Sequence, residues 1–181
     1  MIQDSQNKTI AITFPIAAYQ PKDLAWTLAF IFTAIAFPAL LAHTPQNQWI
    51  TGTIVNAIIF LAVWRVGIVN ATFVAALPSS IALVRGLLPA PMAILVPYII
   101  VSNLVLILIF YSFKKHRLTG VIAASAAKFA FLFVITTLFI PISHPLIGML
   151  QWPQLATALA GGLITASIIK IFTGNRQSFS S

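Results

Sequence analysis

One lysine lies in the middle of a long apolar run, where a charged side chain needs a specific partner. Lys128 falls within residues 119–140, a stretch dominated by apolar residues. At 1.5 Å per residue it lies about 14 Å from the start of that run, close to the centre of a ~30 Å hydrocarbon layer. A lysine at that depth cannot bring its ammonium to water at either end. It must therefore face a polar cavity, a ligand or a hydrogen-bonding partner.

The sequence offers few counter-ions for this lysine. Its only two acids are Asp4 and Asp23, and both precede the first apolar run. We therefore expect Lys128 to bind the carboxylate or phosphate of a small anionic ligand. The alternative is a neutral lysine that is hydrogen-bonded to Asn or Ser side chains or to backbone carbonyls.

Two asparagines lie near the middle of other apolar runs. Asn56 falls within residues 49–64 and Asn103 within residues 92–113. We expect both amides to hold the same ligand as Lys128. Buried amides also commonly bond between membrane helices, so a purely structural role is the alternative for each.

The segment 78–91 combines prolines with polar residues at the end of the third apolar run. It contains Pro78, Ser79, Ser80 and Arg85. Broken helices at membrane depth are tolerated where they line protein or a cavity. We expect this segment to form a lid in which Arg85 and the two serines contact the ligand. An ordinary loop with an isolated arginine is the alternative.

The sequence contains no recognisable catalytic, metal-binding or cofactor-binding set. It has no cysteine, which excludes thiolate chemistry and disulfides. Its three histidines are scattered and have no nearby acids, unlike a zinc site. No phosphate-binding Gly-x-x-x-x-Gly-Lys-Ser/Thr segment occurs, and no base accompanies Ser79 or Ser80. We therefore predict a protein that is not an enzyme, with no catalytic residues, no metal and no cofactor.

The composition requires that these residues be positioned by membrane helices. The chain is 60% hydrophobic and only 7% charged, too few charges to cover a water-facing surface. Its apolar runs are apolar on all sides, as in membrane spans. The sequence predicts an all-α, polytopic membrane protein: a bundle of about six transmembrane helices at 24–42, 49–64, 66–84, 92–113, 119–140 and 153–172. The predicted parts are an N-terminal tail (1–23), the membrane domain (24–173) and a C-terminal tail (174–181).

The basic residues predict the orientation of this bundle. The net charge of +8 would suggest nucleic acid binding in a soluble protein, but here the cations lie at the ends of apolar runs, beside the lipid bilayer. With alternating connections, Arg85 alone falls on one side. Because Lys and Arg accumulate in cytoplasmic loops, both termini should be cytoplasmic in a prokaryotic plasma membrane. The other side receives Lys8, Lys22, Arg65, Lys114, Lys115, Arg117, Lys170 and Arg176.

The first apolar run carries an Ala-x-x-x-Ala segment, Ala25 to Ala29. With the six runs, the small size, the basic charge balance and the lack of an ATPase motif, this pattern resembles the substrate-binding S component of energy-coupling factor (ECF) transporters. The resemblance covers nearly the whole chain. It implies uptake of a small, vitamin-like molecule, powered by separate ATPase subunits. It also implies that Ala25 and Ala29 pack on a transmembrane T component.

Other interpretations of the sequence lead elsewhere. Residues 77–91 are similar to uncharacterised bacterial membrane proteins, some of which are labelled iron hydrogenase, a chemistry without physical support in a chain that lacks cysteine. A second alternative is a non-transporting scaffold or assembly protein in which Lys128 is satisfied internally. A third is a membrane-embedded enzyme without a recognisable site.

Overall fold

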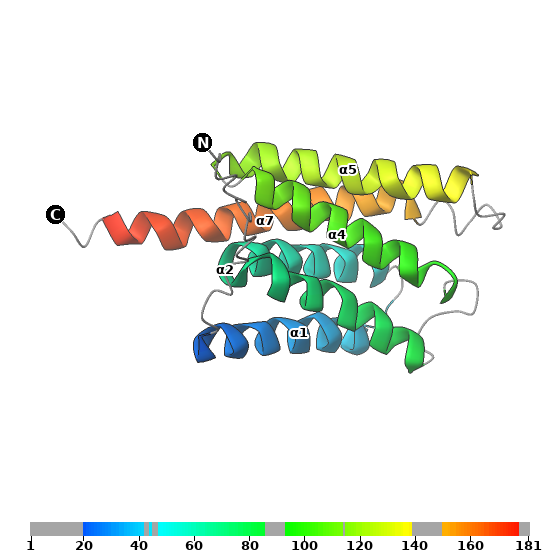
Figure 1. Cartoon of the computed structure of the whole chain (residues 1–181), viewed down its shortest axis with the longest axis horizontal. Coiled ribbons are helices and arrows are strands. Elements are labelled where there is room, and N and C mark those ends of the chain that lie inside the picture. The colour runs from blue at the N-terminus through cyan, green and yellow to red at the C-terminus, as the bar shows by residue number, and fades with distance from the viewer. Residues whose placement is uncertain are drawn as a thin grey trace, which may run out of the picture.

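The protein is all-α in the part of the chain that the structure describes. The computed structural model describes residues 20–41, 44, 47–85, 93–113, 115–138 and 150–177. These residues form five helices and no strand, which confirms the all-α part of the predicted fold class (Figure 1). The helices are α1 (Pro21–Leu41), α2 (Asn47–Val84), α4 (Val96–Ser112), α5 (Arg117–Leu138) and α7 (Trp152–Gln177).

Four of these helices have the length and composition of membrane spans. They are α1, α2, α5 and α7, each with a window of mean hydropathy between 1.8 and 2.1. Helix α4 is also apolar but has 17 residues, so it is the shortest of the five. A helix of about 20 apolar residues crosses the hydrocarbon layer. The described helices therefore support the prediction of a membrane protein.

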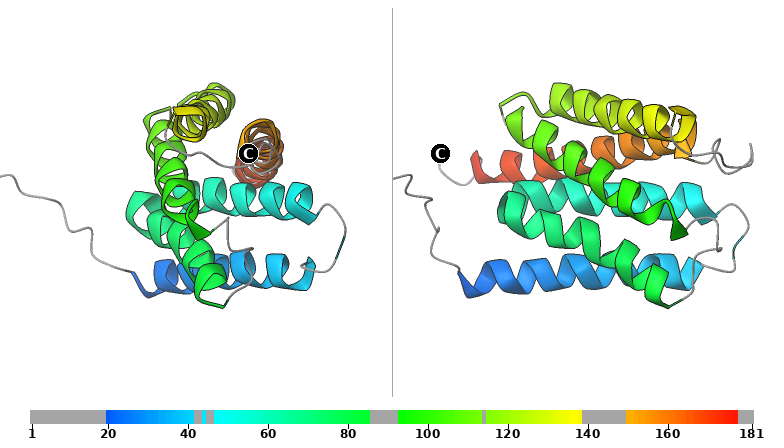
Figure 2. Two further views of the ribbon diagram at one scale, coloured as in Figure 1. Left: turned by 90° about the vertical axis from the view of Figure 1, so that its right-hand side faces the viewer. Right: turned by 45° about the vertical axis from the view of Figure 1, so that its right-hand side comes forward.

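Helix α2 bends sharply at Gly67. This glycine has φ 80° and ψ 179°, a backbone conformation that is essentially restricted to glycine. Figures 1 and 2 show that the chain reverses at this bend, so the two halves of α2 run in opposite directions. The predicted runs 49–64 and 66–84 correspond to these halves. The sequence placed the boundary at Arg65, whereas the turn is at the one residue nearby without a side chain.

Prolines explain where two helices begin. Pro21 starts α1, and Pro97 lies in the first turn of α4, where its missing N–H costs no helical hydrogen bond. Helix α4 therefore starts at Val96 rather than at the predicted Met92. Pro78 has a different outcome from the one expected. It does not end the helix, since α2 continues through it to Val84.

The core lies where α2, α4, α5 and α7 meet. Helix α2 packs against α1, α4 and α7, and α5 packs against α4 and α7. Phe60 and Phe110 meet edge to face there, with ring centroids 4.7 Å apart. Gly162 of α7 faces Phe60 and Val121, and an added Cβ would lie 2.3 Å from the valine. The small residue thus allows α7 to approach the core closely.

The outer surface of the bundle is strongly apolar. Phe32 and Leu40 on α1, Val84 on α2 and Leu138 on α5 each expose more than two thirds of their surface. A water-soluble monomer rarely exposes so many large apolar side chains over all its helices. This surface fits a lipid environment.

Cations gather at one end of the bundle. The start of α1, the bend of α2, the α4–α5 connection and the end of α7 lie at this end (left in Figure 1). Lys22, Arg65, Lys115 and Arg117 belong to these segments, whereas Arg85 follows the opposite end of α2. These four cations therefore belong to segments at one end of the bundle, and Arg85 follows the other end. Lys8 and Lys114 lie outside the described residues.

Candidate functional site

The structure brings the three predicted core polar residues together. Lys128 of α5 is buried, with 3% of its surface exposed. Its Nζ donates a hydrogen bond to Asn56 Oδ1 on α2 at 2.8 Å and another to Asn103 Oδ1 on α4 at 2.7 Å. One lysine thus connects three helices inside the bundle.

The Asn56 amide is oriented by contacts on its other side. Its Nδ2 donates to the Gly52 carbonyl at 2.8 Å and to Thr157 Oγ1 of α7 at 3.3 Å. Because both amide hydrogens point toward these acceptors, Oδ1 is directed to Lys128. The polar centre of the bundle therefore consists of Lys128, Asn56, Asn103 and Thr157, from four helices.

Small residues make this contact between α2 and α7 possible. A Cβ on Gly161 would lie 2.6 Å from the Thr53 carbonyl oxygen and 2.7 Å from the Ala57 nitrogen. A Cβ on Gly52 would lie 3.1 Å from the Thr157 side chain. The two backbones are thus close enough for the short threonine side chain to reach the Asn56 amide.

One buried hydroxyl near Lys128 is unused. Ser125 precedes Lys128 by one helical turn on α5, so both side chains lie on the same face. Its Oγ is fully buried and has no hydrogen-bond partner among the described residues. Buried polar groups are usually paired, so an unpaired hydroxyl beside a lysine is a specific feature of this site.

The polar centre does not contain a negative charge in the described part of the chain. Asn56 and Asn103 offer neutral amide oxygens, and Asp4 lies outside the described residues. The described acid, Asp23, pairs with Arg65 instead, with 3.3 Å between Oδ1 and Nη1. Lys128 is therefore hydrogen-bonded to two amides and has no carboxylate partner among the described residues.

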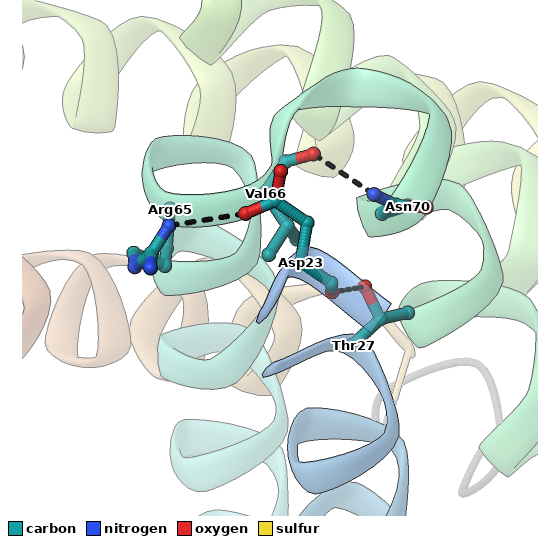
Figure 3. Close-up of polar contacts among 5 residues, drawn as sticks. All are labelled: Asp23, Thr27, Arg65, Val66 and Asn70. Atoms are coloured by element: carbon teal, nitrogen blue, oxygen red, sulfur yellow. Dashed lines mark hydrogen bonds and ion pairs between the residues drawn. The ribbon is translucent and has the colours of Figure 1, made fainter. Parts of the chain in front are cut away.

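The Asp23–Arg65 pair ties α1 to the bend of α2, as Figure 3 shows. The Arg65 guanidinium also lies over the Trp26 ring, 5.4 Å from its centroid. Asn70 donates to the carbonyl oxygen of Val66, just before the bend, at 3.2 Å. From its position between two apolar runs, Arg65 was expected only to mark a side of the membrane. Its pairing had one signal in the sequence: Asp23, one of two acids in the chain, lies about one helical turn before Trp26 at the start of an apolar run.

The described residues of the predicted lid lie in the last turns of α2 and directly after it. Ser80 Oγ donates to the Ala76 carbonyl of its own helix at 3.0 Å. Ser79 is half-buried and Arg85 is exposed. In the described part of the chain, no hydrogen bond or ion pair joins these three residues to Lys128. Residues 86–91 of the expected lid lie outside the described residues.

The predicted partner-binding residues are on the surface. Ala25 and Ala29 are exposed on α1, whereas Thr27 and Ala34 are buried on the side that faces α2. The Ala-x-x-x-Ala face is thus available to lipid or to another protein. Neither the family models nor the curated proteins nor the solved structures compared with this chain give a match.

Proposed function

We propose that this chain is the membrane-embedded substrate-binding subunit of an uptake system. In this proposal Lys128 binds the anionic group of a small, vitamin-like molecule. The observation that carries the proposal is a buried lysine whose hydrogen-bond partners are two neutral amides, with no carboxylate of the described residues bound to it. A protonated lysine has three N–H donors, so one remains for a ligand oxygen. The unused Ser125 hydroxyl, one turn away, is a second donor for the same anion.

The proposed topology has about six crossings with both termini in the cytoplasm of a prokaryotic cell. The crossings are α1, the two halves of α2, α4, α5 and α7. The reversal at Gly67 and the cation-rich end of the bundle support this arrangement. Reporter fusions at Ser181 and near Gln46 test it. A C-terminus found outside would rule out the six-crossing arrangement.

The proposed energy source is a separate ATPase complex, which docks through a T component on the exposed Ala25–Ala29 face of α1. We assign no chemical reaction to this chain. Replacing Ala29 with tryptophan should weaken co-purification of the partner while the isolated protein stays folded. Unchanged co-purification would show that this face is not the docking surface.

A non-transporting scaffold is the second candidate, and one observation favours it. Lys128 already donates to two amides, and it does not line either of two surface pockets near the α4–α5 connection. In that case the lysine would only connect α2, α4 and α5. A ligand reaching Lys128 requires the helices around it to open.

A thermal-shift screen of small anions on the purified protein separates the two candidates. A ligand should stabilise the wild-type protein, and Lys128→Met should weaken its binding by about 2–5 kcal/mol, the usual loss when one partner of a buried charge pair is removed. Lys170→Met, which removes an exposed lysine of α7, is the matched control and should bind normally. A ligand that stabilises all three proteins equally would exclude Lys128 from the site. If no anion binds any of the three proteins and Lys128→Met alone is less stable, the scaffold is favoured.

A further inference from the structure

The cations at the basic end of the bundle differ in whether they have a partner. Arg65 is paired with Asp23 and lies against Trp26. Arg117, at the start of α5, has no acidic partner among the described residues. An arginine without a counter-ion at a membrane interface is available to bind an anion from solution or from lipid.

A pocket of about 370 Å³ lies beside Arg117, where α2, α4 and α5 meet. The bend of α2 forms one wall, and the absent side chain of Gly67 leaves room there, since a Cβ at this position would meet nothing within 4 Å. The lining residues are Val63, Trp64 and Gly67 from α2, Phe110 and Tyr111 from α4, and Arg117.

A second pocket, of about 470 Å³, adjoins the first at Tyr111. It is lined by the α4–α5 connection and contains the exposed cation Lys115 together with His116. Tyr111 thus lines both pockets, and their basic side chains come from the α4–α5 connection and the first residue of α5.

The chemistry of the first pocket fits a phosphodiester group. A guanidinium matches two phosphate oxygens at once. Trp64 and Tyr111 are the residue types that lie at the headgroup level of membranes, and Val63 and Phe110 offer an apolar wall for a glycerol backbone. Basic pockets between membrane helices are known to hold anionic lipid headgroups.

We propose that the junction of α2, α4 and α5 binds the headgroup of an anionic phospholipid, with Arg117 as the phosphate ligand. Exposed apolar side chains in the two pockets favour a lipid over a free phosphate. Trp64, in the first pocket, exposes 39% of its surface, and Phe113, in the second, exposes 38%. These side chains would meet the acyl chains of a lipid whose phosphate enters the pocket. The site is separate from Lys128, so it does not depend on the proposed uptake function.

Lipid binding to the full-length protein tests this assignment. Native mass spectrometry would compare phosphatidylglycerol with phosphatidylcholine for wild type, Arg117→Gln and Lys170→Gln. The preference for phosphatidylglycerol should fall about fivefold or more in Arg117→Gln, the effect of one basic residue near an anionic surface. The control removes an exposed cation of α7 that lines neither pocket, so it should keep the preference. Equal losses in both variants would mean diffuse attraction and would overturn the site.

Two further experiments test the lipid assignment without relying on the Arg117→Gln variant alone. Glycerol phosphate should not stabilise the protein against heat at concentrations where phosphatidylglycerol does. If it does, the pocket takes a soluble phosphate and the lipid assignment is wrong. A photoactivatable phosphatidylglycerol should label wild-type peptides that contain Trp64 or Tyr111. Labelling confined to other helices would overturn the proposal even if Arg117→Gln fails to fold.

Discussion

The two tightly held cations of this bundle, Arg65 and Lys128, are stabilised in different ways. Arg65 lies at the basic end, about a third exposed, with a carboxylate at 3.3 Å and the Trp26 ring beside it. Lys128 lies in the interior and is held by two amide oxygens at 2.7 and 2.8 Å. Arg65 has a carboxylate partner but is partly exposed to water. Lys128 is buried but has no carboxylate partner among the described residues.

This difference in burial and charge partner suggests different roles: the Arg65–Asp23 pair is a structural contact, whereas Lys128 is part of the candidate site. A partly exposed ion pair is screened by water and contributes little, so the Arg65–Asp23 pair mainly fixes how α1 meets the bend of α2. Burying a charged lysine costs several kcal/mol of desolvation, which the hydrogen bonds to its two amide partners must offset. A lysine in this position either binds an anion or, as a neutral amine, only connects the three helices.

The largest predicted effect concerns the interior region. Lys128→Met should destabilise the protein because the Asn56 and Asn103 oxygens each lose their donor, at about 1–3 kcal/mol for each orphaned group. Replacing all three residues together, with Lys128→Met, Asn56→Leu and Asn103→Leu, should recover most of this loss. The measurement is thermal or denaturant unfolding in detergent.

Two results would contradict this account of the interior. A triple variant no more stable than Lys128→Met would show that the amide–lysine bonds do not determine its stability. A comparable loss in Lys170→Met would show that the effect is not specific to a buried lysine, because Lys170 is exposed and such changes usually stay within about 0.5 kcal/mol.

A smaller effect is predicted where α7 meets α2. Gly161→Ala should destabilise the protein by about 3 kcal/mol, since the new methyl group would meet two backbone atoms of α2 at 2.6 and 2.7 Å. The helices would have to separate, which would also lengthen the Thr157–Asn56 contact. Gly52→Ala meets only a threonine side chain at 3.1 Å and should cost less. Unfolding of both variants measures the difference, and equal losses would argue against the close approach at Gly161.

A glycine substitution at the basic end, Gly67→Ala, should destabilise the protein through backbone strain rather than a clash. The new Cβ would have open space, but φ 80° with ψ 179° is unfavourable for any residue that has a side chain. The expected cost is about 1–3 kcal/mol. Gly67→Asn should give no rescue, because asparagine tolerates the left-handed helical region rather than this one. Two unchanged unfolding curves would show that the bend does not need glycine.

The polar centre could be predicted from the sequence because lipid leaves few solutions for a polar side chain. A lysine and two asparagines in the middle of apolar runs must find one another or a ligand, and Lys128 indeed contacts Asn56 and Asn103. Thr157 could not be found this way. Its hydroxyl donates to the Gln154 carbonyl of its own helix, as many threonines here do, for example Thr51 to Asn47. Sequence alone does not show that the same hydroxyl also accepts a hydrogen bond from Asn56 of α2.

The number and bounds of the helices were predicted less completely. Hydropathy located the apolar runs, but it could not distinguish a loop near Arg65 from a bend at Gly67, because both interrupt a helix over a few residues. At Pro78 the sequence predicted an interruption that the structure does not have. Helix α2 continues through this proline to Val84, as membrane helices often do.

The smallest predicted effect is at the Asp23–Arg65 pair. Asp23→Asn should cost only about 0.2–1 kcal/mol, because both side chains are about a third exposed and water screens the pair. A double-mutant cycle with Arg65→Gln isolates the coupling between the two residues, and 1 M salt should reduce it, since the screening length falls to about 3 Å. The Lys128–amide bonds in the interior should not respond to salt. A coupling above about 2 kcal/mol that persists in high salt would mean that the Arg65 pair is shielded from water as Lys128 is, and the distinction between the two regions would fail.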